Sequence, residues 1–281
     1  MKKTKQRPAP LPGPREAMRE NPVVATVYFL LRFSVILVMI AQFFNKNFEN
    51  VFLCVLTLIL LLLPAMLERS LRIQLPDTLE IIILLFIYAA EILGEIREFY
   101  TTFQGWDTML HTLNGFLCAA IGFSLVDLFN RNERFSLSLS PAFMAIVAFC
   151  FSMTIGVLWE FFEFFMDSFF GMDMQKDTVV HAIHSVTLDP TRTNQVVTIS
   201  GITDTAVNGE SLGLGGYLDI GIIDTMKDLF VNFLGALVFS VSGYFYARSR
   251  GKKKSPALNF VPTRKTPEQD YLQQAQEEEQ P

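Results

Sequence analysis

The chain has 281 residues, of which 51% are hydrophobic and 18% are charged, and phenylalanine alone occurs 27 times. Soluble domains carry about a quarter charged residues, so this composition excludes a disordered chain and argues against a soluble globular enzyme. The formal net charge of −5 gives no general basis for binding nucleic acid. The three cysteines, Cys54, Cys118 and Cys150, lie inside apolar runs, which indicates small buried side chains and not a disulfide or zinc set.

Six apolar windows predict an all-α membrane protein with six transmembrane helices. A helix needs about 20 mainly apolar residues to cross a hydrocarbon core of about 30 Å. The windows are residues 23–44, 49–67, 79–99, 108–129, 141–166 and 225–247. No small-residue cleavage site follows the first window, which therefore indicates a retained anchor and not a removed signal peptide.

The distribution of lysine and arginine predicts that both termini are cytoplasmic. The two tails and the loops after the second and fourth windows carry 17 of the 23 basic residues, whereas the loops on the opposite side carry three. Basic residues are enriched in cytoplasmic loops of membrane proteins. We therefore expect a protein of the plasma (inner) membrane whose remaining loops are external.

The windows divide the chain into five segments. In order these are a cytoplasmic tail, five spans, an external segment, the sixth span and a second cytoplasmic tail, at residues 1–22, 23–166, 167–223, 224–247 and 248–281. Both tails have the polar composition of disordered segments. In the external segment, the strand-like run 196–199 and the turn signals Asn208-Gly209 and Gly215-Gly216 predict a small β-structured cap.

Ionisable residues inside the predicted spans gather near the ends of four helices. Such residues are costly in a membrane and usually functional. Residues three or four apart share a helical face, and this spacing predicts four polar stripes. The stripes are Glu91, Glu95 and Glu98; Asp107, His111 and Asn114; Glu160, Glu163 and Asp167; and Asp224, Asp228 and Asn232. Because alternate spans run in opposite directions, all four stripes are expected at the external leaflet.

Several carboxylates in one poorly solvated pocket need charge compensation, by a bound cation or by protons. Carboxylates with one imidazole suit Zn²⁺, Mn²⁺, Mg²⁺ or Fe²⁺. The candidate metal ligands are Asp107, His111, Glu160, Glu163 and Asp228, and the further polar residues of the pocket are Glu95, Asn114, Asp224 and Asn232. Glu160 and Glu163 are also the candidate catalytic residues.

Structural roles remain open for the same residues. Asp107 would complement the dipole of its helix and pair with His111, and Arg97 is a candidate ion partner for the acids of the fifth span. Arg32, inside the first span, is interpreted as a snorkelling side chain. His181 and His184 have a spacing that suits one helical face, as solvated residues or as ligands.

At Trp106-Asp107-x3-His111, Trp159-Glu160-x2-Glu163 and Asp224-Thr225-x2-Asp228-x3-Asn232-x2-Gly235, the chain resembles the YjdF family of bacterial integral membrane proteins. More remotely it resembles the VanZ-like group, and the resemblance covers about residues 23–247. It implies a multi-pass protein of the bacterial cell membrane. The VanZ-like likeness further implies a role in the cell envelope or in glycopeptide resistance.

Three functions remain open. The first is a metal-dependent enzyme that acts at the outer leaflet on a lipid-linked or phosphorylated envelope substrate. The second is a cation- or proton-coupled transporter, against which the absence of an inverted repeat and of a second polar cluster counts. The third is a non-catalytic partner within the lipid bilayer, whose polar network only fixes helix packing. The sequence contains no Walker A loop, serine-hydrolase elbow or dinucleotide fingerprint, so nucleotide-driven work and serine hydrolysis are not expected.

Overall fold

Five helices of the computed structural model are long and apolar enough to cross a bilayer, judged by length and composition. They are Pro22–Phe44, Phe48–Ser70, Trp106–Asp127, Pro141–Phe170 and Ile222–Ser249, and the second of them contains a turn at residues 61–62. The structure describes residues 22–71, 73–130, 139–249 and 262–264, and the count of five refers to these residues. Five of the predicted spans are confirmed as long apolar helices. The predicted tails lie almost entirely outside the described residues.

The remaining predicted span, residues 79–99, is helical but changes its helical period. Helix α5 (Asp77–Tyr88) continues directly into the π-helix η1 (Ala89–Ile96), and a short helix α6 (Phe99–Thr102) follows Glu98, whose φ is +58°. A π-helix bonds each N–H one residue further back than an α-helix does. Neither α5 nor η1 alone reaches the length of a span, so six spans are not confirmed. Hydropathy could not predict this division, because it does not register a change of hydrogen-bond period.

The chain divides into two compact units, and helices α8 (Pro141–Phe170) and α9 (Ile222–Ser249) continue from one unit into the other. The first unit comprises residues 1–153 and 232–281, and the second comprises residues 154–231. Each unit is described by itself below.

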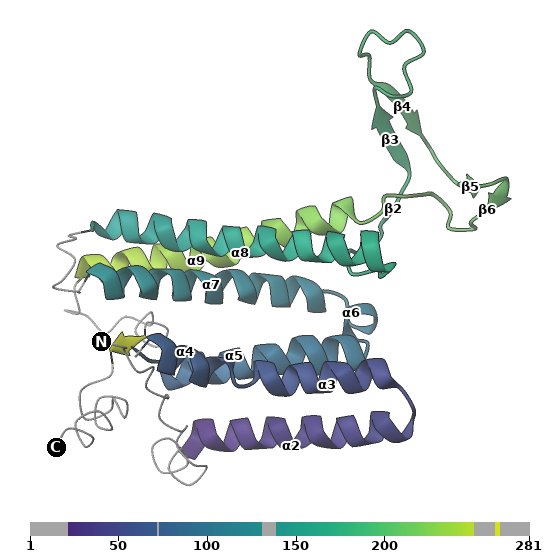
Figure 1. Ribbon diagram of the computed structural model, residues 1–281. Coiled ribbons are helices and arrows are strands. Elements are labelled where there is room, and N and C mark those ends of the chain that lie inside the picture. Colours follow the sequence, from purple (N-terminus) through teal and green to yellow (C-terminus); the bar gives the residue numbers. More distant parts are fainter. Residues whose placement is uncertain (1–21, 72, 131–138, 250–261, 265–281) are drawn as a thin grey trace, which may run out of the picture. The chain divides into compact units, whose positions relative to one another are not determined.

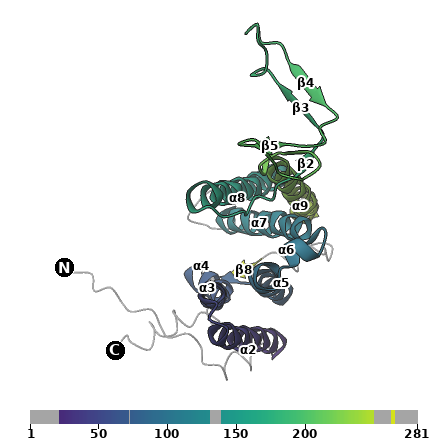
Figure 2. The same cartoon turned by 90° about the vertical axis from the view of Figure 1, so that its right-hand side faces the viewer.

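In the first unit, α2 (Pro22–Phe44), α3 (Phe48–Leu60) and α5 lie side by side (Figures 1 and 2). Their buried side chains form one apolar cluster with η1 and with part of α7 (Trp106–Asn130). A turn separates α3 from α4 (Leu63–Leu71), because Pro64 has no N–H to continue the bonding pattern. The chain then forms strand β1 (Ile73–Gln74), which pairs antiparallel with β8 (Thr263–Arg264).

Helix α7 (Trp106–Asn130) is the most enclosed of the five, with 56% of its apolar window buried against 17% for α2. Two glycines allow α7 and α9 to approach closely within the first unit. A Cβ atom at Gly115 would collide with the carbonyl of Asn232, and one at Gly235 would collide with the carbonyl of Thr112. Small residues at helix contacts are typical of membrane proteins, since they let backbones meet.

The second unit contains the C-terminal part of α8, the first turns of α9 and a β-arm of residues 179–218 between them (Figure 1). The arm consists of three antiparallel strand pairs: β2 (Val179–Val180) with β7 (Tyr217–Leu218), β3 (Ala182–Ser185) with β4 (Val197–Ser200), and β5 (Ala206–Val207) with β6 (Glu210–Ser211). The predicted β structure of this segment is confirmed. The Asn208-Gly209 turn lies between β5 and β6, with φ angles of +54° and +87°.

The contact of α7 with α9 predicts that Gly235→Ala destabilises the protein by about 1–3 kcal/mol, because backbone and not a flexible side chain occupies the space. Gly243→Ala is the matched control on the same helix. There the added methyl meets only ring atoms of Phe123 and Phe239, the nearest at 3.0 Å. Thermal unfolding in mild detergent measures both variants. Equal losses of stability in the two would contradict a specific role for Gly235.

Candidate functional site

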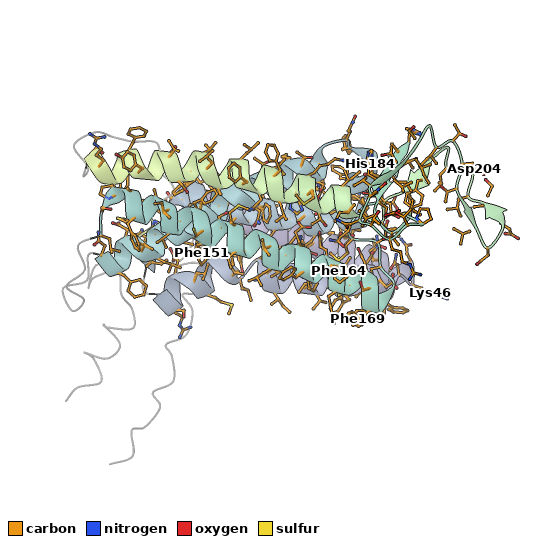
Figure 3. The ribbon with its side chains drawn as sticks, turned by 90° about the horizontal axis from the view of Figure 1, so that it is seen from above. Lys46, Phe151, Phe164, Phe169, His184 and Asp204 are labelled. Carbon is orange, nitrogen blue, oxygen red and sulfur yellow. The ribbon has the colours of Figure 1, made fainter. Side chains whose placement is uncertain are left out.

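The C-terminal part of α8 buries its acids and exposes its phenylalanines, the reverse of a helix in water. Glu160 is 4% exposed and Glu163 is 8% exposed, and Gly156 is buried on the same face. By contrast, Phe164 is 59% and Phe169 is 73% exposed, and their rings lie on the outside of the helix (Figure 3). Lipid is the solvent that favours this arrangement, because it accepts apolar rings and excludes unpaired charge.

Helix α9 shows the same inversion in its first turns. Asp228 is 3% exposed, whereas the neighbouring Met226 and Phe230 are each 59% exposed. One turn further along, Asn232 is 1% exposed. The predicted polar stripe from Asp228 to Asn232 therefore lies on the buried face of α9.

On α7, Asp107 and His111 form a pair one turn apart. The Nε2 atom of His111 lies 3.4 Å from Oδ1 of Asp107, and His111 is almost fully buried. The structure thus brings together the predicted imidazole and one of the predicted carboxylates. The indole of Trp106 stands edge-on to Phe99, with 5.0 Å between the ring centroids. Its buried Nε1 has no acceptor within the described part of the chain, which leaves a hydrogen-bond donor beside Asp107.

Asn114 and Asn232, predicted as polar residues of the pocket, meet where α7 contacts α9. The Nδ2 of Asn114 donates to Oδ1 of Asn232 at 3.4 Å, and the Sγ of Cys118 lies 3.4 Å from Oδ1 of Asn114. The hydroxyl of Ser152, on α8, donates to the carbonyl of Gly115 at 2.7 Å. These bonds satisfy polar groups within the first unit, so both asparagines contribute to helix packing.

Within the second unit, Glu163 accepts a hydrogen bond of 2.9 Å from Nε1 of Trp159, one turn earlier on α8. The bond fixes one carboxylate oxygen of Glu163. The spacing of four residues between Trp159 and Glu163 was the available sequence signal for this contact.

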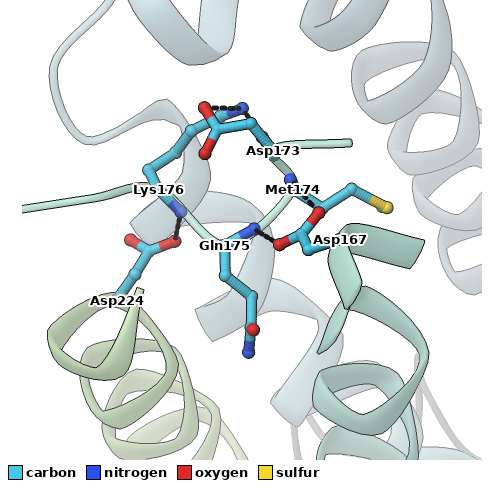
Figure 4. Close-up of polar contacts among 6 residues, drawn as sticks. All are labelled: Asp167, Asp173, Met174, Gln175, Lys176 and Asp224. Atoms are coloured by element: carbon cyan, nitrogen blue, oxygen red, sulfur yellow. Dashed lines mark hydrogen bonds and ion pairs between the residues drawn. The ribbon is translucent and has the colours of Figure 1, made fainter. Parts of the chain in front are cut away.

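Asp167 and Asp224 hold the backbone of the loop that leaves α8 (Figure 4). Asp167 accepts from the N–H groups of Met174 at 2.6 Å and Gln175 at 2.8 Å, and Asp224 accepts from the N–H of Lys176 at 2.7 Å. Asp224 was predicted as a polar residue of the pocket. One of its contacts is with this loop.

The predicted stripe on the third span falls on η1. Glu91 is half-buried, whereas Glu95, a predicted polar residue of the pocket, is exposed, as are Arg97 and Glu98. The wider turn of a π-helix shifts the angular positions of these side chains, so the α-helical spacing that grouped them does not apply here.

The spacing of His181 and His184 would suit one helical face, but both residues lie in the β-arm. His181 lies at the bend between β2 and β3, and His184 lies in β3. The Nδ1 of His181 lies 3.0 Å from the carbonyl oxygen of Ile202, and Nδ1 of His184 lies 2.9 Å from the hydroxyl of Thr198. Both side chains are exposed and serve the strand pairs of the arm.

Sequence reasoning missed Asp189, which organises the loop between β3 and β4. Its carboxylate accepts from the hydroxyl of Thr191 at 2.6 Å and from the N–H groups of Thr191, Thr193 and Gln195 at 2.9 to 3.1 Å. The Thr191 hydroxyl contributes most to lowering the pKa of Asp189 to about 2, followed by the N–H of Gln195. An aspartate followed by Thr and Asn residues is the sequence signal for such a turn.

Long apolar helices whose acids are buried and whose phenylalanines face outward define a polytopic membrane protein. The chain matches the sequence profile of a family described as predicted membrane proteins (DUF2238) over residues 27–249. It therefore belongs to this family. No curated protein matches the chain, and no solved structure does.

The Asp189 contacts predict that the β3–β4 loop loses order only in strong acid. The carboxylate is favoured in the folded state, so its contribution is fully present above the unfolded pKa of about 3.9 and is lost as pH falls through about 2. Amide-exchange protection factors of Thr193 and Gln195 should be equal at pH 7 and pH 5 and should fall toward pH 2. Asp189→Asn should lower them already at pH 7, whereas Asp204→Asn should not. Protection that does not depend on Asp189 would contradict this account.

Proposed function

We propose that this protein binds a divalent cation through Asp107, His111 and Asp228 and uses it at the external leaflet on a phosphorylated or lipid-linked substrate. The observation that carries the proposal is the burial of acids on helix faces whose opposite faces are phenylalanine-rich. A buried carboxylate in a lipid-facing protein requires either a counter-charge or a proton. Asp107, His111 and Asp228 each offer one ligand atom, two carboxylate oxygens and an imidazole nitrogen.

The register of α7 and α9 supports this choice of ligands. Phe116 contacts Phe239, and Phe123 contacts Tyr246 further along both helices, so the two helices run in the same direction where they touch. Gly115 meets Asn232 in that contact. His111 lies one turn before Gly115 on α7, and Asp228 lies one turn before Asn232 on α9, which supports a single ligand set drawn from both helices.

A cation bound to these ligands would polarise a phosphoryl or carbonyl oxygen or lower the pKa of a bound water. Glu160 and Glu163 would then serve as general acid and base or as additional ligands. The indole N–H of Trp106 is available to a substrate oxygen. A purely structural network is the alternative, and the Asn114–Asn232 contact favours it for those two residues.

The proposal includes a topology with both termini cytoplasmic and with α5 and η1 together forming a sixth span. Residues 77–96 are helical without a break, and these 20 residues are about the number that a helix needs to cross the hydrocarbon core. An even number of spans returns the chain to the side on which it began, as the distribution of basic residues requires. The resemblance to the YjdF family and to the VanZ-like group supports a location in the bacterial plasma membrane and a substrate from the cell envelope.

This topology predicts the labelling of single cysteines placed in a background without Cys54, Cys118 and Cys150. A membrane-impermeant maleimide added to intact cells should modify a cysteine at Asn208, in the β-arm, and should not modify one at Asn132. After the cells are permeabilised, both positions should react. Labelling of Asn132→Cys alone in intact cells would contradict the orientation.

The cation site predicts that a chelator lowers the melting temperature of the purified protein in mild detergent and that Mn²⁺ or Zn²⁺ restores it. A ligand at a hundredfold excess over its Kd stabilises the folded state by about 2.7 kcal/mol. His111→Ala should lose most of this recovery, because imidazole is the strongest transition-metal ligand of the set.

His181→Ala is the matched control, since this histidine lies in the β-arm and contacts the Ile202 carbonyl. It should respond to chelator and metal like the wild type. If the melting temperature of the wild type is indifferent to chelator and to added metal, the cation proposal fails, and protonated acids in a packing network become the better account.

A further inference from the structure

Arg32 is a permanent positive charge halfway along a membrane-spanning helix. It is the eleventh of the 23 residues of α2, so about 15 Å of helix precede it and about 18 Å follow it. A guanidinium has five N–H donors and keeps its charge at any physiological pH. In the middle of a bilayer such a group is costly unless a partner satisfies it, and for this reason it usually marks a functional position.

The described residues satisfy Arg32 only in part. Its Nη1 donates to the phenolic oxygen of Tyr28 at 2.5 Å, and its guanidinium carbon lies 5.3 Å from the centroid of that ring. Helix α2 itself contains no acid. The acids of α3 and α5, which pack against α2, lie in first turns, at Glu49 and at Asp77 and Glu80. Within the described part of the chain, no carboxylate forms an ion pair with Arg32.

An arginine also bonds a tyrosine four residues earlier near the end of α9, and there the arginine snorkels to the membrane surface. Arg248 donates from Nη1 to the phenolic oxygen of Tyr244, four residues earlier, at 3.3 Å. Arg248 is exposed in the last turn of α9, where its head group reaches water directly. Arg32 is half-buried, and the distance of about 15 Å to the end of its helix exceeds the reach of an arginine side chain. The bond to Tyr28 therefore does not bring the charge to the membrane surface.

The flank of Arg32 that faces away from the apolar core is a continuous apolar surface. Its exposed side chains are Phe29, Leu30, Phe33, Ile36, Leu37 and Ile40. These side chains suit lipid or another apolar helix equally well, so they do not distinguish the two. The partly satisfied guanidinium of Arg32 does distinguish them, because hydrocarbon offers its remaining N–H donors no acceptor whereas a carboxylate binds it with two parallel hydrogen bonds.

We propose that α2 is the docking surface for a transmembrane helix of another protein that carries an Asp or Glu side chain level with Arg32. Complementary charge at mid-depth identifies the partner, and the apolar side chains beside it supply the packing. A neutral polar residue on the partner would leave the charge of Arg32 uncompensated. The inference does not depend on the cation site, because α2 contains none of its proposed ligands.

The test uses the full-length protein, labelled with a fluorescence donor, in vesicles of phosphatidylcholine at pH 8. The probes are acceptor-labelled transmembrane peptides of leucine and alanine with one central Asp or one central Asn. Energy transfer should show that the Asp peptide binds about tenfold more tightly, since an ionic hydrogen bond of about 1.4 kcal/mol corresponds to that factor. Arg32→Gln should remove the preference, Arg32→Lys should retain part of it, and Arg248→Gln should leave it unchanged.

A peptide with its Asp moved to the last turn should bind no better than the Asn peptide, because the charge then no longer lies level with Arg32. Circular dichroism and size-exclusion profiles check that Arg32→Gln remains folded. Equal binding of the Asp and Asn peptides to the wild type would overturn the proposal. So would a preference that survives Arg32→Gln, or Arg32-dependent energy transfer between copies of the protein with no peptide present.

Discussion

The need to keep charge away from hydrocarbon determines how this chain folds. Lipid accepts the phenylalanines on the outside of α8 and gives no hydrogen bond to a carboxylate, so Glu160, Glu163 and Asp228 are turned inward. In a soluble protein the hydrophobic effect would arrange the same residues the other way round. The burial of acids is therefore a result of the membrane setting, and their compensation is the requirement from which a function follows.

Carboxylates have one role inside the membrane-spanning helices and another in the loops. Inside the helices, Asp107 pairs with an imidazole and Glu163 with an indole N–H. In the loops of the second unit, aspartates accept backbone N–H groups, as Asp189 does between β3 and β4. A carboxylate in a loop organises the backbone and remains near water. A carboxylate in a span has few such donors, so another side chain, a cation or a proton must compensate it.

Much of the fold could be predicted from the sequence because its signals are local. Apolar length gave the helices, and the Asn208-Gly209 pair gave the β5–β6 turn. The division of the third predicted span could not be predicted, since η1 differs from an α-helix in hydrogen-bond period and not in hydropathy. The same limit applied to Glu95, whose exposure depends on the wider turn of η1.

The candidate site was predicted to the level of helix faces and not of individual contacts. Spacing of three and four residues identified the buried faces of α8 and α9, and it placed Asp107 with His111. It could not show that Asn114 and Asn232 bond each other, because that contact joins residues 118 positions apart. It also could not assign partners to His181 and His184, which contact Ile202 and Thr198 in the β-arm.

We propose that Asp107, His111 and Asp228 hold a divalent cation. The most direct test is to measure the metal content of the full-length protein by inductively coupled plasma mass spectrometry. The protein is purified in detergent without chelator. The account predicts about one divalent transition metal per chain in the wild type, and much less in Asp228→Asn, whose side chain keeps its size and loses its charge. Asp204→Asn, in the β-arm, should retain the metal. A wild-type protein that carries no metal, and takes none up on dialysis against Mn²⁺ or Zn²⁺, would contradict the account.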